Sequence, residues 1–221
     1  MEGSPLLASV VWHIGALFCH QLPDRSPQFD GTIFPLCFRC AGLYLSLAVT
    51  FGWLAVTGGF RRRLPELRYA LGISMLTVPL MVDGLANAIG LWSSPGLVRA
   101  LTGAGVGLVL PLLLVPLAQC QAPAPAPVMQ ATLKTPLRIL PPAVISVALL
   151  WLLAHPLQSW IFHWLAAAAS AAPLVFWSTL LLAGWRNRAL FGSELRICSA
   201  RRSLLASDGC RRSAIDGAHL H

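Results

Sequence analysis

Long apolar runs alternate with short polar and basic segments along this chain. A helix needs about 20 apolar residues to cross the hydrocarbon core of a bilayer. The runs that approach or reach this length are residues 5–19, 37–59, 69–92, 97–117, 139–154 and 160–185. We therefore predict an all-α fold, a polytopic bundle of about six transmembrane helices.

Two of these runs contain residues that affect helix geometry and packing. The third run holds Pro79 and the charged Asp83 followed by Gly84, so we predict that this span is broken near Asp83-Gly84. The fourth run contains Gly103, Gly105 and Gly107 within apolar sequence. Glycines in this setting favour close helix packing over phosphate binding.

The composition supports a membrane protein and bears on its orientation. The 221 residues are 56% hydrophobic and 11% charged, with a mean hydropathy of +0.69, whereas a soluble domain is about a quarter charged. The net charge of +8 is concentrated in basic clusters after the second, fourth and sixth runs. These clusters predict a multi-pass protein of the cytoplasmic (inner) membrane with both termini cytoplasmic. The expected partners are the lipid bilayer and its anionic head groups, rather than nucleic acid.

The same pattern divides the chain into segments. We expect a membrane domain of about four spans over residues 1–118, and an Ala/Pro-rich linker over residues 119–138, where Ala-Pro repeats favour extended backbone. Two further spans occupy residues 139–185. Residues 186–221 form a basic tail without a long apolar period, which predicts a loosely ordered cytoplasmic segment.

The densest polar passage before residue 60 is CHQLPDRSPQFDGTIFPLCFRC, residues 19–40. Cys37 and Cys40 are three residues apart at a helix start, so they share one face, and the helix N-terminus and Arg39 favour a thiolate there. Cys19 and His20 complete a Cys3His set, which suits tetrahedral zinc or another thiophilic ion. The topology predicts that this metal site faces the exterior.

Other functions fit the same residues. Cys37 and Cys40 could cycle as a dithiol in a membrane thiol–disulfide oxidoreductase, with Cys19 as the exchanging thiol, or form a plain structural disulfide. His20 could instead be an interfacial histidine that donates to a carbonyl. A small transporter is a third possibility, with Asp83 lining a path through the broken third span.

Charged residues form a second candidate site. A carboxylate inside a spanning segment usually pairs or faces a cavity, and we predict Arg99, across the turn at residues 93–96, as the partner of Asp83. A structural ion pair that fixes helix packing is the simpler interpretation. Arg25 and Arg39 lie between the cysteines in the sequence and could hold an anionic group near a bound metal, bidentately if that group is a carboxylate or phosphate.

These passages resemble a known family. CHQLPDRS and PLCFRCAGLY closely resemble the opening signature of a membrane protein family catalogued as domain of unknown function 2085. The matching positions are Cys19, His20, Gln21, Pro23, Arg25, Ser26, Pro35, Cys37, Arg39, Cys40 and Gly42. Asp83-Gly84 and the segment from Arg99 to Gly103 resemble its second and third motifs. Asn87 replaces the family's usual Gln, and Ser93-Ser94-Pro95 replaces Glu-Ser-Asn. The resemblance covers about residues 10–110 and implies a membrane protein without implying a reaction.

Overall fold

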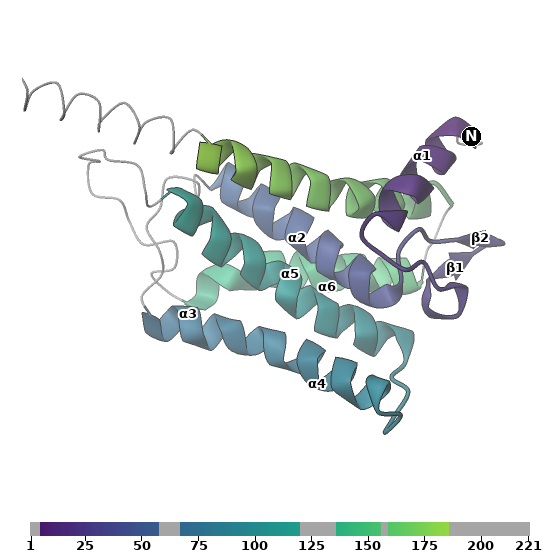
Figure 1. Cartoon of the computed structure of the whole chain (residues 1–221), viewed down its shortest axis with the longest axis horizontal. Helices are drawn as coiled ribbons and strands as arrows, with labels where there is room; N and C mark the ends of the chain where they lie inside the picture. Colours follow the sequence, from purple (N-terminus) through teal and green to yellow (C-terminus); the bar gives the residue numbers. More distant parts are fainter. Residues whose placement is uncertain (1–4, 58–66, 120–135, 156–158, 186–221) are drawn as a thin grey trace, which may run out of the picture.

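The computed structural model describes residues 5–57, 67–119, 136–155 and 159–185 (Figure 1). Most of the expected linker and the whole of the expected basic tail, residues 186–221, lie outside the described residues. Within them, the fold is helical apart from one short hairpin. The elements are α1 (Pro5–Ala16), η1 (Pro23–Arg25), β1 (Gln28–Phe29), β2 (Thr32–Ile33), α2 (Phe38–Val56), α3 (Leu67–Ser74), η3 (Met75–Thr77), α4 (Val78–Ala88), α5 (Gly96–Gln119), η4 (Pro136–Ile139) and α6 (Leu140–Ala154), followed by a C-terminal helix, Ser159–Trp185.

The prediction of an all-α membrane bundle is confirmed. Four helical segments are long and apolar enough to cross a membrane: Phe38–Val56, Leu67–Ala88, Gly96–Ala118 and Ser159–Trp185. Two shorter helices, α1 with 12 residues and α6 with 15, lie at the positions of the first and fifth expected spans. Many large apolar side chains on the bundle are exposed, including Leu71, Met81 and Trp164. Lipid is the environment that accommodates such a surface.

The break in the third span lies earlier than the sequence predicted. Helix α4 runs without interruption through Asp83-Gly84, and the irregularity is the single 3-10 turn η3, Met75–Thr77. Pro79 explains this position, because proline has no N–H to donate to the carbonyl four residues earlier. The N–H of Val78 bonds to the Met75 carbonyl instead, which tightens the turn.

Helices α2 and α5 approach so closely that their backbones touch. A Cβ atom added at Gly42 would lie 1.9 Å from the carbonyl oxygen of Ala100, and one at Gly103 would lie 2.1 Å from that of Arg39. Gly107 meets the Leu43 carbonyl in the same way, at 2.1 Å, and Gly105 meets that of Leu76 at 2.3 Å. The predicted close packing at the glycines of α5 is therefore confirmed.

The cysteine segment lies at one end of this bundle. Figure 1 shows α1, the β1–β2 hairpin, the start of α2 and the turn between α4 and α5 gathered at that end. The hairpin pairs Gln28 with Ile33 and Phe29 with Thr32, and its two turn residues, Asp30 and Gly31, both have positive φ, as a tight primed turn requires. The sequence predicted only a non-helical loop here.

Apolar anchors hold this end against the bundle. Phe34 and Leu36 are fully buried. The ring of Phe34 packs edge-on against that of Phe162 in the C-terminal helix, with the ring centroids 5.2 Å apart. The centroid of the Phe29 ring lies 5.9 Å from that of Phe162. Because Phe34 and Leu36 immediately precede Cys37, their burial fixes where α2 begins.

We predict that Gly42→Ala destabilises the protein, because its methyl group would collide with the α5 backbone, which cannot move aside. Overpacking of this kind typically costs about 1–3 kcal/mol. Gly52→Ala in the same helix is the matched control, since no atom lies within 4 Å of its added Cβ. Thermal unfolding in one detergent should show a lower melting temperature for Gly42→Ala only. Equal melting temperatures for the two variants would contradict the close contact.

Candidate metal centre and its charged surroundings

The turn after α1 places Cys19 and His20. Helix α1 ends in a turn with backbone bonds from Leu17 to Ile14 and from Phe18 to Gly15. Gln21 then takes a left-handed backbone conformation, with φ of 49°, which is uncommon for a residue with a side chain. Its Nε2 donates to the carbonyls of Trp12, at 2.7 Å, and Pro35, at 3.0 Å. The Gln21 amide therefore ties the end of α1 to the segment that leads into α2.

Cys37 and Cys40 lie at the first turn of α2. Cys37 is the N-cap residue, and its backbone N–H donates to the Sγ of Cys19 at 3.2 Å. All three sulfur atoms lie within 4.8 Å of one another. Among the described residues these cysteines are free thiols, Cys19 buried and the other two half-buried. The structure thus brings together residues that are 18 to 21 positions apart in sequence.

The sulfur atoms influence one another's protonation. Hydrogen bonds donated by the Cys37 and Cys40 thiols, with the Cys37 backbone N–H in support, lower the pKa of the Cys19 thiol. The same contact with Cys19 raises the pKa of Cys37. Cys19 is therefore the sulfur that carries negative charge most readily.

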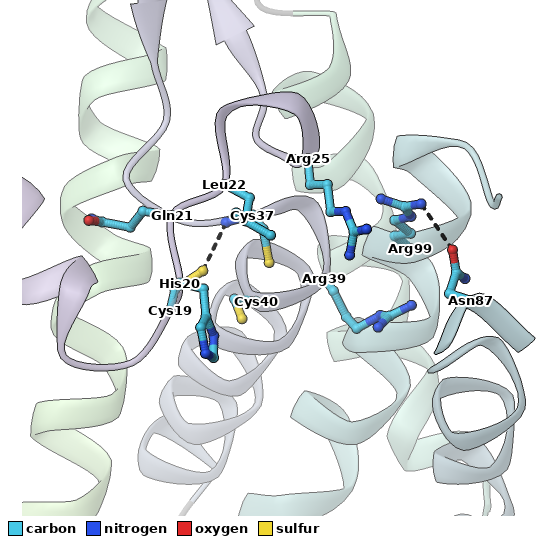
Figure 2. Close-up of a pocket in the computed structure, with 10 residues that line it drawn as sticks. All are labelled: Cys19, His20, Gln21, Leu22, Arg25, Cys37, Arg39, Cys40, Asn87 and Arg99. Atoms are coloured by element: carbon cyan, nitrogen blue, oxygen red, sulfur yellow. Dashed lines mark hydrogen bonds between the residues drawn. The ribbon is translucent and has the colours of Figure 1, made fainter. Parts of the chain in front are cut away.

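His20 lies apart from the sulfur group. The ligand atoms within 4.8 Å of one another are the three sulfurs and do not include a His20 nitrogen. His20 is exposed, yet it lines the same pocket as the cysteines (Figure 2). The structure therefore joins three of the four expected metal ligands.

The partner of Asp83 is Arg39, not Arg99, so the predicted direct pair was wrong. Arg39 Nη2 donates to Asp83 Oδ2, and the side chain of Asp83 is only 3% exposed. Arg39 Nη1 lies 3.9 Å from where a Cβ at Gly84 of α4 would stand, which is an ordinary contact distance, so the Arg39 side chain lies against α4 beside Asp83. Arg39 extends from α2 to α4 and neutralises a carboxylate that would otherwise be buried alone.

Arg99 reaches Asp83 through Asn87. Arg99 Nη2 donates to Asn87 Oδ1 at 3.0 Å, and Asn87 Nδ2 donates to Asp83 Oδ1 at 3.1 Å. Ser94 Oγ accepts from Arg99 Nε at 3.1 Å and from Asn87 Nδ2 at 3.0 Å. Sequence reasoning did not assign a role to Asn87 or Ser94. The available signal was the spacing of Asn87, four residues after Asp83 and hence on the same helix face.

Comparison with known proteins places this site within a recognised sequence unit. A family profile described as "Predicted membrane protein (DUF2085)" matches residues 19–113, from the first cysteine of the cluster into α5. The chain belongs to this family. An uncharacterized protein of Methanothermobacter thermautotrophicus is 34% identical over 94 residues, 42% of this chain and 81% of that protein. Another, from Methanocaldococcus jannaschii, is 29% identical over 96 residues, 42% of this chain and 58% of that protein. No solved structure matches.

The DUF2085 match and the pocket coincide. The pocket has a volume of about 240 Å³. Figure 2 shows the residues that line it, which are the three cysteines together with His20, Gln21, Leu22, Arg25, Arg39, Asn87 and Arg99. All of these residues fall inside the matched range. Sulfur ligands and guanidinium groups therefore face one common space at the end of the bundle.

We predict that Arg39 and Asp83 are energetically coupled. Asp83→Asn and Arg39→Gln should each lower the melting temperature, since each leaves one partner without its counter-charge. The double variant should be more stable than the sum of the singles implies, by roughly 1 kcal/mol or more. A parallel cycle of Asp83→Asn with Arg138→Gln, at the opposite end of the bundle, should be additive. Additivity in both cycles would show that Arg39 and Asp83 are not partners.

Proposed function

We propose that this DUF2085 protein binds a thiophilic metal ion, zinc in the first instance, through Cys19, Cys37 and Cys40. The observation that supports the proposal is the grouping of three free sulfurs within 4.8 Å. Zinc–sulfur bonds are about 2.3 Å long, so two thiolates on one tetrahedral ion lie roughly 3.8 Å apart. Shifts of about 1 Å or less convert the observed grouping into that arrangement.

The surroundings of the sulfurs favour this chemistry. Metal binding requires thiolates, and the backbone N–H of Cys37 already donates to Cys19 Sγ. Hydrogen bonds of this kind orient a ligand and stabilise its charge. Both α2 cysteines lie at the start of a 19-residue helix, where the dipole favours negative charge.

The fourth ligand decides what the metal does. His20 follows Cys19 directly and lines the same pocket, so rotation of its exposed side chain would close a Cys3His site of structural type. If His20 stays outside, water or a substrate occupies the fourth position, and the ion is available for chemistry. We propose His20 as the weaker, exchangeable ligand.

A thiol–disulfide oxidoreductase is the second candidate, favoured by the three thiols being free and adjacent. In that case the Cys19 thiolate would exchange with a disulfide formed between Cys37 and Cys40. The two electrons and two protons released when that disulfide forms would pass to a separate acceptor of disulfide or quinone type.

We further propose the orientation of the protein in the cytoplasmic membrane. The cysteine end faces the exterior, and the opposite end faces the cytoplasm, with its basic segments against anionic lipid head groups. The sequence places the basic clusters after α2, after α5 and after the C-terminal helix. Two cytoplasmic termini require α1 to cross, although its 12 residues rise only about 18 Å against a hydrocarbon core of about 30 Å. We also propose, from the sequence, that residues 119–138 form a linker and residues 186–221 a cytoplasmic tail.

We predict about one zinc ion per chain in protein purified without chelator at neutral pH. Changing Cys19, Cys37 or Cys40 to Ser should remove most of the metal, and His20→Ala should remove less, because water can replace the imidazole. Cys198→Ser, in the tail, is the control and should leave the metal content unchanged. The measurement is elemental analysis of each variant.

Metal-free wild-type protein with a Cys37–Cys40 disulfide, isolated under gentle conditions, would favour the oxidoreductase over the metal site. Mass spectrometry after thiol alkylation, with and without mild reductant, detects that disulfide.

The orientation can be tested with reporter fusions. We predict an exterior signal for a reporter near Gln28 and a cytoplasmic signal for one near residue 126. A cytoplasmic signal at Gln28 would reverse the proposed orientation. A reporter ahead of α1 then decides the number of crossings, since a cytoplasmic signal requires α1 to cross and an exterior signal excludes it.

A further inference from the structure

Three arginines from separate segments converge on the pocket beside the cysteines. Arg25 ends η1, Arg39 lies in the first turn of α2, and Arg99 lies in the first turn of α5. All three line the same cavity, and Figure 2 shows their side chains together on the side of it away from Gln21, with Arg99 directed at Asn87. Like charges repel, so their convergence requires compensation.

The protein itself supplies little of that compensation. Asp83 is the carboxylate bonded to this group, and it pairs with Arg39 from behind the pocket. If the cysteines bind a zinc ion as thiolates, the metal centre adds one net negative charge, and together with Asp83 it still leaves the three arginines in excess by one. Without a metal, a Cys19 thiolate supplies the same single negative charge, so an excess of at least one remains.

Many of the guanidinium donors are also free. Each arginine carries five N–H donors. Within the described part of the chain, Arg25 has no side-chain hydrogen bond or ion pair, and Arg99 bonds through Nε and Nη2 to Ser94, Asn87 and Ser93, leaving Nη1 without a partner. Arg39 Nε is buried and has no partner among these residues. The open Arg25 donors and Arg99 Nη1 can therefore donate to an anion that enters the pocket, whereas the buried Arg39 Nε is closed to it.

The number and direction of these donors identify the ligand class. A planar carboxylate is satisfied by one bidentate arginine, whereas a tetrahedral oxyanion presents acceptors in several directions at once. The cavity has a volume of about 240 Å³, far more than one water molecule needs. That space holds a phosphate group together with bridging waters.

We propose that Arg25 and Arg99 bind a phosphate-class oxyanion in this pocket, with Arg39 in support. Arg39 is positioned by Asp83, and Arg99 is positioned by Asn87 and Ser94, so two of the three cations are held in place before the anion arrives. Arg25 is exposed, and it closes over the anion from the loop. The arginine contacts do not depend on a metal, so this inference stands apart from the proposed zinc site.

The test uses the full chain in detergent and inorganic phosphate as the probe. Isothermal titration should show saturable binding to the wild type, and Arg25→Gln should weaken it about tenfold or more, the loss that one charge-assisted hydrogen bond represents. Arg138→Gln, the same change at the opposite end of the bundle, should bind like the wild type. Arg25 makes no side-chain contact that folding needs, so its replacement leaves the test valid even if Arg99→Gln does not fold.

Absence of saturable phosphate binding to the wild type, or equal affinity of Arg25→Gln and Arg138→Gln, would overturn the proposal. The second result would mean that Arg25 is simply a solvated charge.

Two further experiments distinguish a lipid head group from a soluble phosphate compound, and the phosphate site from the metal site. Phosphate binding is measured in nanodiscs of phosphatidylcholine, with and without added phosphatidylglycerol. If phosphatidylglycerol abolishes phosphate binding, the pocket binds a lipid head group. If phosphate binding is unchanged, the pocket binds a soluble phosphate compound. Cys37→Ser protein that loses metal but keeps phosphate supports independent sites. If the wild-type protein binds zinc but not phosphate, the phosphate proposal is wrong and the metal proposal stands. If it binds phosphate but not zinc, only the proposed metal function is wrong.

Discussion

The close contact between α2 and α5 is the constraint on which the arrangement of the site depends. Gly42 and Gly103 allow each helix to rest on the other's backbone, so the first turns of both helices meet at one end of the bundle. Those turns carry Cys40, Arg39 and Arg99. In a bilayer, where apolar side chains gain little by leaving lipid, such close packing is a principal source of helix association. The packing of the bundle and the composition of its pocket therefore have the same cause.

The second constraint is the turn that returns Cys19 to the start of α2. Gln21 adopts a left-handed conformation and uses its amide to bond α1 and the Pro35 carbonyl together. Gly15 makes room for this, because a Cβ there would lie 2.6 Å from the Pro35 oxygen. Phe34 and Leu36 then anchor the approach to Cys37 by burial. A loop held from three sides can keep three sulfurs together, and a metal ion would add a fourth restraint.

The long apolar runs predicted where the helices lie, because a bilayer sets both the length and the composition of a spanning helix. The short distance between Cys37 and Cys40 was also readable, since helical spacing fixes it. The pairing of residues from different segments could not be predicted from the sequence. Arg39 bonds Asp83 directly and Arg99 reaches it through Asn87, and the choice between them depends on how the helices are rotated against one another, which no local pattern encodes. Asn87 and Ser94 were given no role because neutral polar residues near a helix end are common. The sequence placed the break in the third span too late, because Pro79 interrupts the helical hydrogen bonds and Asp83-Gly84 does not.

The proposed function depends on the coordination of one metal ion by Cys19, Cys37 and Cys40. X-ray absorption at the zinc edge of the purified wild-type protein tests it most directly, because the method reports the type, number and distance of the atoms bound to the metal. We expect three sulfur ligands at about 2.3 Å and one lighter ligand at about 2.0–2.1 Å, with the lighter ligand altered in His20→Ala. A spectrum with only nitrogen and oxygen neighbours would contradict it.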